Sequence, residues 1–151
     1  MFLQIDDVRA FLQAPAADEE KLFECAEAAC GKVEALCGVI LPQIMTETVR
    51  VENGIAPVSH HVLTAPDGWL PTSSPWRWRV GGPDGWRTVT YDAGYRGVPP
   101  WAASAGRAIA RQLWRTQLGP ARREEPGVPA GFLVPNLASE LMADHVRPAG
   151  C

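Results

Sequence analysis

The chain has 151 residues, a formal net charge of −3 and a hydrophobic fraction of 46%, which is enough apolar material for one globular domain with a packed core. The small net charge gives no concentrated basic surface of the kind that tight duplex DNA binding requires. No apolar run reaches the roughly 20 residues of a membrane-spanning helix, and residues 1–13 lack the basic and apolar regions of a signal peptide. The sequence therefore predicts a protein made in the cytoplasm, with no membrane partner.

Two helices are predicted in the first quarter of the chain. Asp6 or Asp7 is a good N-cap for a short helix, whose apolar face carries Val8, Phe11 and Leu12. Asp18 is expected to cap a second helix that runs to about Cys37 and ends at Gly38.

The second helix is strongly amphipathic. Its apolar stripe is formed by Leu22, Ala26, Ala29, Val33 and Leu36, and the same stripe takes in Cys25, Cys30 and Cys37. These three cysteines are therefore predicted to be small buried hydrophobic residues, and their spacing matches no common zinc framework. The opposite face carries Glu20, Glu24, Glu27 and Glu34.

Residues 46–95 change to a β pattern. Val49 and Val51 alternate before Asn53-Gly54, which is a strong signal for a type I′ hairpin. In "WRWRV", Trp76, Trp78 and Val80 share one face. "GGPDG" reads as a turn and "WRTVTY" as a returning strand, whereas "TAPDGWLPTSSP" reads as a loop. The middle third is thus a small antiparallel β insertion.

A third helix is predicted to begin at Pro99 or Pro100 and to end at Gly119-Pro120. One of its faces consists of Ala102, Ala105, Gly106, Ile109 and Leu113, which are small enough to let another helix approach. Another face carries Arg107, Arg111 and Arg115. Residues 119–135 have the composition of a linker, and Asn136 is expected to cap a short terminal helix over residues 136–147.

No catalytic motif appears in the sequence, and no enzyme activity, cofactor or metal is predicted. His60 and His61 are adjacent, so in a strand they would point to opposite faces and could not share one ion. His145 lies near the end of the last predicted helix, where a cation is favourable.

The tryptophans leave an alternative function open. Trp76, Trp78 and Trp86 could form an aromatic platform that binds a glycan or single-stranded nucleic acid. The other interpretation is that these large rings cover one face of a small sheet. In the same way, the three helical arginines are either a contact surface or a solvated helix face.

The stretch "VTYDAGYRGVPPW" joins the β insertion to the third helix. Gly94 and Gly97 are expected to adopt backbone angles that other residues avoid. The ring of Tyr95 is expected to pack on the helical bundle with its hydroxyl in water, and Pro99 to begin the following helix. The stretch is therefore predicted to be a structural hinge.

This order of elements resembles the head–tail connector (adaptor) proteins of long-tailed phages, over nearly the whole chain. Members of that family open with two helices, as in "IDDVRAFLQAPAADEEKLFECAEAACGKVEALCG", and often carry a strand that ends in a sequence like "TYDAGYRGVPPW". The expected fold is a single α+β domain over residues 1–151, a small helical bundle with an antiparallel β insertion between the second and third helices.

The resemblance implies a structural protein of the virion neck. Such proteins form a ring beneath the portal, typically of twelve copies, extend the channel through which DNA passes without sequence-specific binding, and dock the next neck (stopper) protein. The end of the chain is expected to reach the portal through Leu137, Leu141 and Val146. A chain without residues 136–151 is then expected to fold but not to attach to portal-bearing heads. The expected subunit interface joins two rows of charge, Glu20, Glu24 and Glu27 on one side and Arg107, Arg111 and Arg115 on the other.

Overall fold

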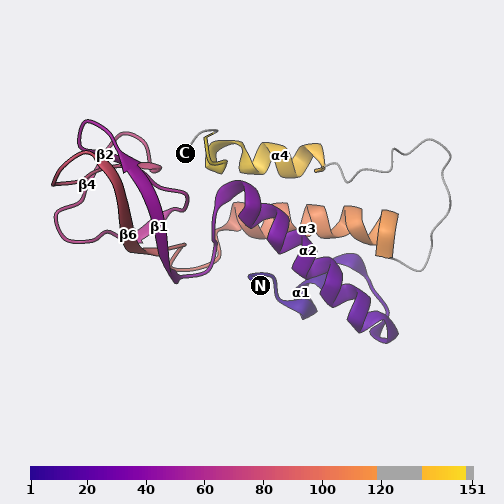
Figure 1. Cartoon of the computed structure of the whole chain (residues 1–151). Coiled ribbons are helices and arrows are strands. Elements are labelled where there is room, and N and C mark those ends of the chain that lie inside the picture. The colour runs from indigo at the N-terminus through magenta and orange to yellow at the C-terminus, as the bar shows by residue number, and fades with distance from the viewer. Residues whose placement is uncertain (119–133, 149–151) are drawn as a thin grey trace. The chain divides into compact units, whose positions relative to one another are not determined.

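The computed structural model describes residues 1–118 and 134–148, and these fall into two compact units (Figure 1). The helical unit comprises residues 1–33 and 100–144, and the sheet unit comprises residues 34–99 and the chain from His145 onward. Both helices and antiparallel sheets are present, so the chain belongs to the α+β class, as predicted. The predicted linker over residues 119–135 lies mostly outside the described residues.

Four α-helices occur in the described part of the chain: α1 (Ile5–Leu12), α2 (Glu19–Cys37), α3 (Pro100–Leu113) and α4 (Asn136–Met142). A short 3-10 turn, Ala16–Asp18, precedes α2, and a π-helical segment, Trp114–Leu118, follows α3. Within the helical unit α3 packs against both α1 and α4. The Cys25 thiol donates a hydrogen bond to the Ala110 carbonyl oxygen at 2.9 Å, which joins α2 to α3.

The helix termini differ from the predictions in two places. The N-cap of α1 is Gln4, which makes no side-chain capping bond, and Asp6 and Asp7 lie inside the first turn, where their negative charge favours the helix dipole. The N-cap of α4 is Pro135, so Asn136 is the first helical residue and not the cap. By contrast, α2 begins directly after Asp18 and is closed by Gly38 at φ +79°, as predicted.

The core of the helical unit consists largely of the residues predicted on the apolar faces of α2 and α3. All five small or apolar residues predicted on α3 are buried. The three cysteines of α2 are buried as well, whereas Leu36 is exposed, contrary to prediction. Phe11 of α1 is also exposed although it was expected in an apolar face. The side chains of Phe2 and Leu3 pack against Gly106. The absence of a side chain at Gly106 therefore lets the N-terminal segment approach α3 closely.

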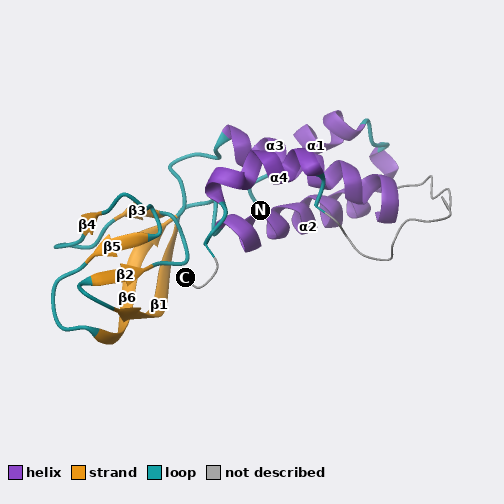
Figure 2. Cartoon of the chain, turned by 90° about the horizontal axis from the view of Figure 1, so that it is seen from above, coloured by secondary structure: helices purple, strands orange, loops and turns teal. Residues whose placement is uncertain are grey.

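The sheet unit contains six strands between α2 and α3 (Figure 2). They are β1 (Gln43–Val51), β2 (Ile55–Pro57), β3 (Val62–Thr64), β4 (Leu70–Pro71), β5 (Arg77–Arg79) and β6 (Gly85–Ala93). One sheet has the order β1-β6-β3 and the other β2-β5-β4, with antiparallel pairing throughout. The predicted antiparallel insertion between the second and third helices is therefore confirmed.

The connection between β1 and β2 is the predicted type I′ turn. Asn53 and Gly54 have φ values of +54° and +71°, the double positive φ that this turn requires. Their backbone N–H groups donate to the Asp84 carboxylate at 2.7 and 3.0 Å. The bond from Gly54, and then that from Asn53, lower the pKa of Asp84. The "GGPDG" segment thus supplies an acceptor to a distant turn.

That segment is not a hairpin turn, however. β6 pairs with β1 and β3, while β5 pairs with β2 and β4, so the chain passes from one sheet to the other between them. The predicted return of "WRTVTY" onto "WRWRV" is therefore wrong. The predicted loop "TAPDGWLPTSSP" also contains β4. Val49, Val51, Val89 and Tyr91 belong to the buried cluster of this unit.

Candidate interaction surfaces

The acidic row lies on the exposed side of α2. Glu20, Glu24 and Glu27 are all exposed, and none of the ion pairs among the described residues involves them. Glu34, which shares their predicted face, behaves differently: its carboxylate accepts the Ile40 backbone N–H at 3.2 Å. The free acidic surface is thus confined to the first half of the helix.

The basic row lies on α3 and its π-helical extension, where Arg111 and Arg115 are exposed and Arg107 is half-buried. Two of the three arginines lie over an aromatic ring. The guanidinium carbons of Arg107 and Arg111 are 6.0 and 5.9 Å from the centre of the Phe11 ring. This distance suits a cation–π contact. Phe11, which is 44% exposed, therefore belongs to the basic surface and not to the core.

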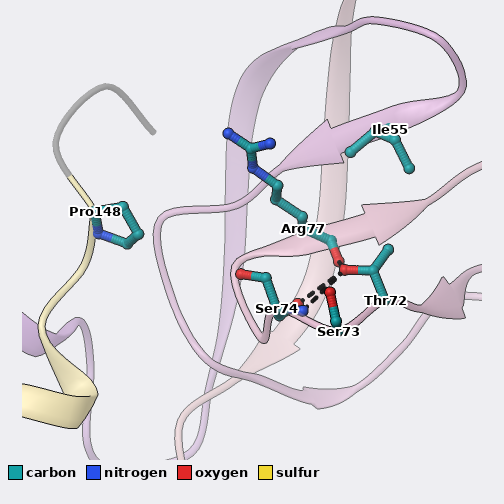
Figure 3. A pocket seen from close by; sticks show the side chains of 6 residues that line it. All are labelled: Ile55, Thr72, Ser73, Ser74, Arg77 and Pro148. Carbon is teal, nitrogen blue, oxygen red and sulfur yellow. Dashed lines mark hydrogen bonds between the residues drawn. The ribbon is translucent and has the colours of Figure 1, made fainter.

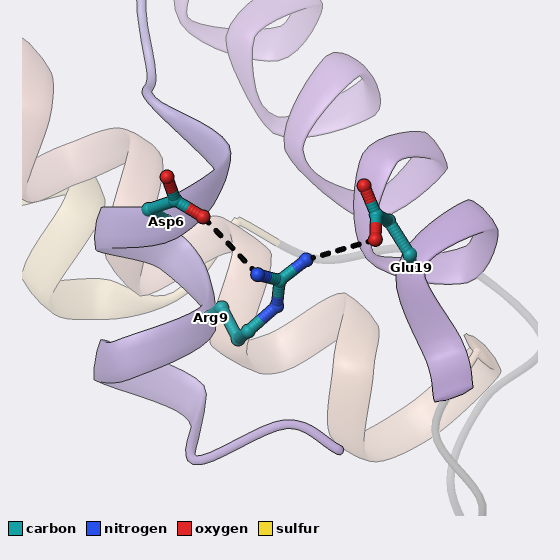
Figure 4. A network of polar contacts seen from close by, with 3 residues as sticks. All are labelled: Asp6, Arg9 and Glu19. Carbon is teal, nitrogen blue, oxygen red and sulfur yellow. Dashed lines mark hydrogen bonds and ion pairs between the residues drawn. The ribbon is translucent and has the colours of Figure 1, made fainter. Parts of the chain in front are cut away.

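Arg9 takes no part in the basic row, because its charge is satisfied inside the chain. It bridges Asp6 at 3.1 Å and Glu19 at 3.2 Å, and so ties α1 to the first turn of α2 (Figure 4). Its Nε has no hydrogen-bond partner. Such partly exposed pairs add at most about 1 kcal/mol each, so their role is to orient α1.

The residues predicted to dock the portal are divided between the two units. Leu137 is 60% exposed and Leu141 half-buried, one turn apart on α4, while Ala138 and Met142 of the same helix are buried. Val146 is exposed but belongs to the sheet unit. The buried Met142 shows that α4 is part of a core, so a chain without residues 136–151 is expected to lose stability, and its folding stays a prediction.

The predicted hinge depends on Gly94. Its φ is +103°, and a Cβ atom here would lie 2.5 Å from the Leu41 carbonyl oxygen. The Gly94 N–H donates to the His61 carbonyl oxygen at 2.9 Å, and the Tyr95 N–H donates to the Ile40 carbonyl oxygen at 3.0 Å. The end of β6 is thereby bound to the segment that follows α2.

The other hinge residues act differently from the prediction. The Tyr95 ring stacks on the His61 ring, with 4.4 Å between the ring centres, within the sheet unit. Burial raises the pKa of Tyr95, with a smaller contribution from Cys37 at the end of α2. Gly97 does not have a positive φ, and nothing lies within 4 Å of an added Cβ, so the position does not require glycine. Pro99 precedes the first residue of α3, Pro100.

His60 and His61 are not strand residues. Each ring contacts the backbone of another segment. The His60 Nδ1 accepts a hydrogen bond from the Val39 N–H, after α2, at 3.2 Å, and the His61 Nδ1 lies 3.1 Å from the Gly94 carbonyl oxygen, after β6. Burial lowers the pKa of His60, which agrees with its role as an acceptor. Both histidines therefore hold the connection between α2 and β3 through their ring nitrogens.

A partly buried hydrogen-bond network that the sequence did not reveal joins β1 and β6 to Ser59. The Tyr91 hydroxyl donates to the Glu47 carboxylate at 2.5 Å, and the same oxygen accepts the Ser59 N–H at 3.0 Å. Burial and then the Glu47 bond raise the pKa of Tyr91. The alternation of β1, which places Glu47 on the same face as Val49, is the signal from which it could have been found.

The three tryptophans proposed as an aromatic platform are not brought together. Trp76 is buried, and the Trp78 indole N–H donates to the Pro75 carbonyl oxygen at 3.2 Å. Trp86 is 71% exposed but lies on β6, in the other sheet. The three rings therefore do not form one exposed platform, and binding of a glycan or of single-stranded nucleic acid stays a prediction.

One shallow cavity, of about 480 Å³, lies on the sheet unit and is lined by Ile55, Thr72, Ser73, Ser74, Arg77 and Pro148 (Figure 3). Its polar groups are largely used by the loop itself. The Thr72 hydroxyl donates toward the carbonyl oxygens of Ser74 and Arg77, at 3.1 and 2.6 Å. The Arg77 side chain points away from the serine hydroxyls. The cavity thus offers no convergent set of free polar groups.

The buried thiols of α2 are poor nucleophiles, because burial raises the pKa of Cys25 and of Cys37 to about 11. Among residues 1–118 and 134–148, no three histidine, cysteine or acidic side chains are grouped so that they could hold a metal ion. No helix in that same part of the chain has both the length and the apolar character to cross a bilayer. Cys151 lies outside the described residues.

The chain matches no protein-family model and no curated protein.

Proposed function

We propose that this chain is a structural protein of a virion neck, a head–tail connector that forms a ring of twelve copies beneath the portal. The ring would extend the DNA channel without reading base sequence. One side would dock the portal protein, through Leu137 and Leu141 on α4, and the other side would dock the next neck or tail protein. The proposal assigns no catalytic residue and no cofactor.

Two features support it. The helices and strands follow the order on which the resemblance to connector proteins rests, with α3 beginning at the double proline. Fold order alone does not specify function, so the proposal depends chiefly on the two charged rows. They lie on different helices of one unit, and their opposite signs suit a heterologous interface, in which two different faces of neighbouring copies meet.

Charge reversal tests this use of the rows. Arg111→Glu is expected to weaken ring formation, because it places an acidic side chain opposite the acidic row of the next copy. Adding Glu24→Arg to the same chain should restore part of the loss. Each exposed pair contributes at most about 1 kcal/mol, so charge sets orientation more than affinity.

Ring formation is measured by counting copies in particles and by sedimentation of the purified chain. Arg96→Glu is the matched control, since Arg96 is exposed but lies outside both rows. If Arg111→Glu assembles like the parent at low and moderate salt, the rows are only solvated helix faces and the proposal loses its main support.

A further inference from the structure

Each charged row includes side chains that lie next to an exposed aromatic ring. On α2, Phe23 is 46% exposed and lies between the glutamates at the spacing i, i+3, i+4 and i+7, which places all four side chains on one stripe. We call Glu20, Phe23, Glu24 and Glu27 the acidic aromatic patch. The ring of Phe11 beneath the Arg107 and Arg111 guanidiniums forms the basic aromatic patch.

We propose that these two patches are the two halves of one contact between copies of this chain, with Phe11 of one copy and Phe23 of the next as its apolar centre. The inference rests on the proposed function only for the closure of the contact into a ring. It adds the residues that supply affinity, which the charged rows alone do not.

A second copy is the occupant that the charges favour. Either patch brought against its own equivalent would oppose like charges, so a two-fold contact is disfavoured and a head-to-tail contact is favoured. DNA would be repelled by the acidic patch and would leave it uncovered. The chain itself carries a partner of opposite charge for each patch, with an aromatic ring at the same central position.

The chemistry of the patches is that of an interface centre. Aromatic and arginine side chains dominate binding energy where surrounding groups exclude water. Closing one patch on the other would remove both rings from water and lower the dielectric around the flanking Arg–Glu pairs, which strengthens them. The rings therefore supply affinity, and the charges supply register.

Complementation between two variants tests the proposal. Phe11→Ser removes the centre of the basic patch and Phe23→Ser that of the acidic patch, so each variant alone is expected to associate at least tenfold more weakly than the parent. Mixed in equal amounts they should form a one-to-one dimer and stop there. One intact patch from each chain can meet, and the remaining two patches are inactive. Ile44→Ser is the control, because Ile44 is 73% exposed and belongs to neither patch.

Association is measured by analytical ultracentrifugation of the full chain, in low salt and in 1 M salt, where charges more than about 3 Å apart are screened. Thermal unfolding of each variant establishes that it is folded. A mixture that stays monomeric, or a parent that is monomeric up to about 1 mM, overturns the inference. A third result also overturns the inference. If the parent binds a duplex DNA probe without self-associating, and Phe11→Ser no longer binds that probe, then the partner of the basic aromatic patch is DNA and not a second copy. A chain that associates through these patches but is absent from the neck of a particle would contradict the proposed function and leave the contact intact.

Discussion

Gly94→Ala is expected to destabilise the protein by about 3 kcal/mol or more. The backbone at this position has φ +103°, which alanine adopts only with strain, and the added Cβ would lie 2.5 Å from a backbone carbonyl oxygen of Leu41. A carbonyl cannot move aside as a flexible side chain can, so relief requires the segment after α2 to shift away from β6. That shift would stretch the bond from Tyr95 N–H to the Ile40 carbonyl oxygen.

Gly97→Ala provides the matched control three residues away. Its backbone is not in the positive φ region and no atom crowds an added Cβ, so stability should be unchanged or rise by up to about 1 kcal/mol. Urea unfolding, followed by circular dichroism and tryptophan fluorescence, measures both variants. Equal stability of the two alanine variants would contradict the close packing at Gly94.

Met142→Ala is the second substitution with a large expected effect, a loss of about 2 to 4 kcal/mol. Met142 is fully buried although it lies on a helix of only seven residues. A helix this short has little stability alone, so it depends on the side chains that it inserts among its neighbours. Removing the Met142 side chain leaves a cavity and detaches α4 from α3.

Leu137→Ala, on the same helix, is the control for Met142→Ala. Its side chain is exposed, and the expected change is within about 0.5 kcal/mol. The comparison is made by chemical unfolding of both variants. If Leu137→Ala costs as much as Met142→Ala, then the assigned inner and outer faces of α4 are wrong. If neither substitution has an effect, α4 contributes nothing to the core.

Local sequence signals predicted those parts of the fold that depend on neighbours along the chain. The apolar stripe of α2, the small buried face of α3, the close of α2 at Gly38 and the Asn53-Gly54 turn all follow from periodicity or turn chemistry. Such features are determined within one helix or one turn.

The pairing of β5 and β6 could not be read in this way. Both strands have suitable residues and a turn sequence between them, but their partners are chosen by long-range packing into two separate sheets. The same limitation applies to the tryptophans: Trp76 lies in the turn before β5 and is buried, whereas Trp86 lies on β6 and is exposed.

The charged residues of the proposed contact surface could be predicted from the sequence, but the aromatic ring of Phe11 at its centre could not. The spacing of Glu20, Glu24 and Glu27 indicated an exposed row, whereas Phe11 was assigned to the core because it shares a helical face with Val8. In the structure Val8 is buried and Phe11 lies beside two arginines that come from α3. That contact joins residues almost a hundred positions apart, and no local pattern reports it.

The position of this chain in assembled particles tests the central claim most directly. The measurement is a cryo-electron microscopy reconstruction of particles from cells that express it, with copies counted in the density. The account predicts a ring of twelve copies beneath the portal, in contact with the portal above and the next neck protein below. Density for the chain elsewhere in the particle, or its absence from particles that are complete with tails, would contradict the account.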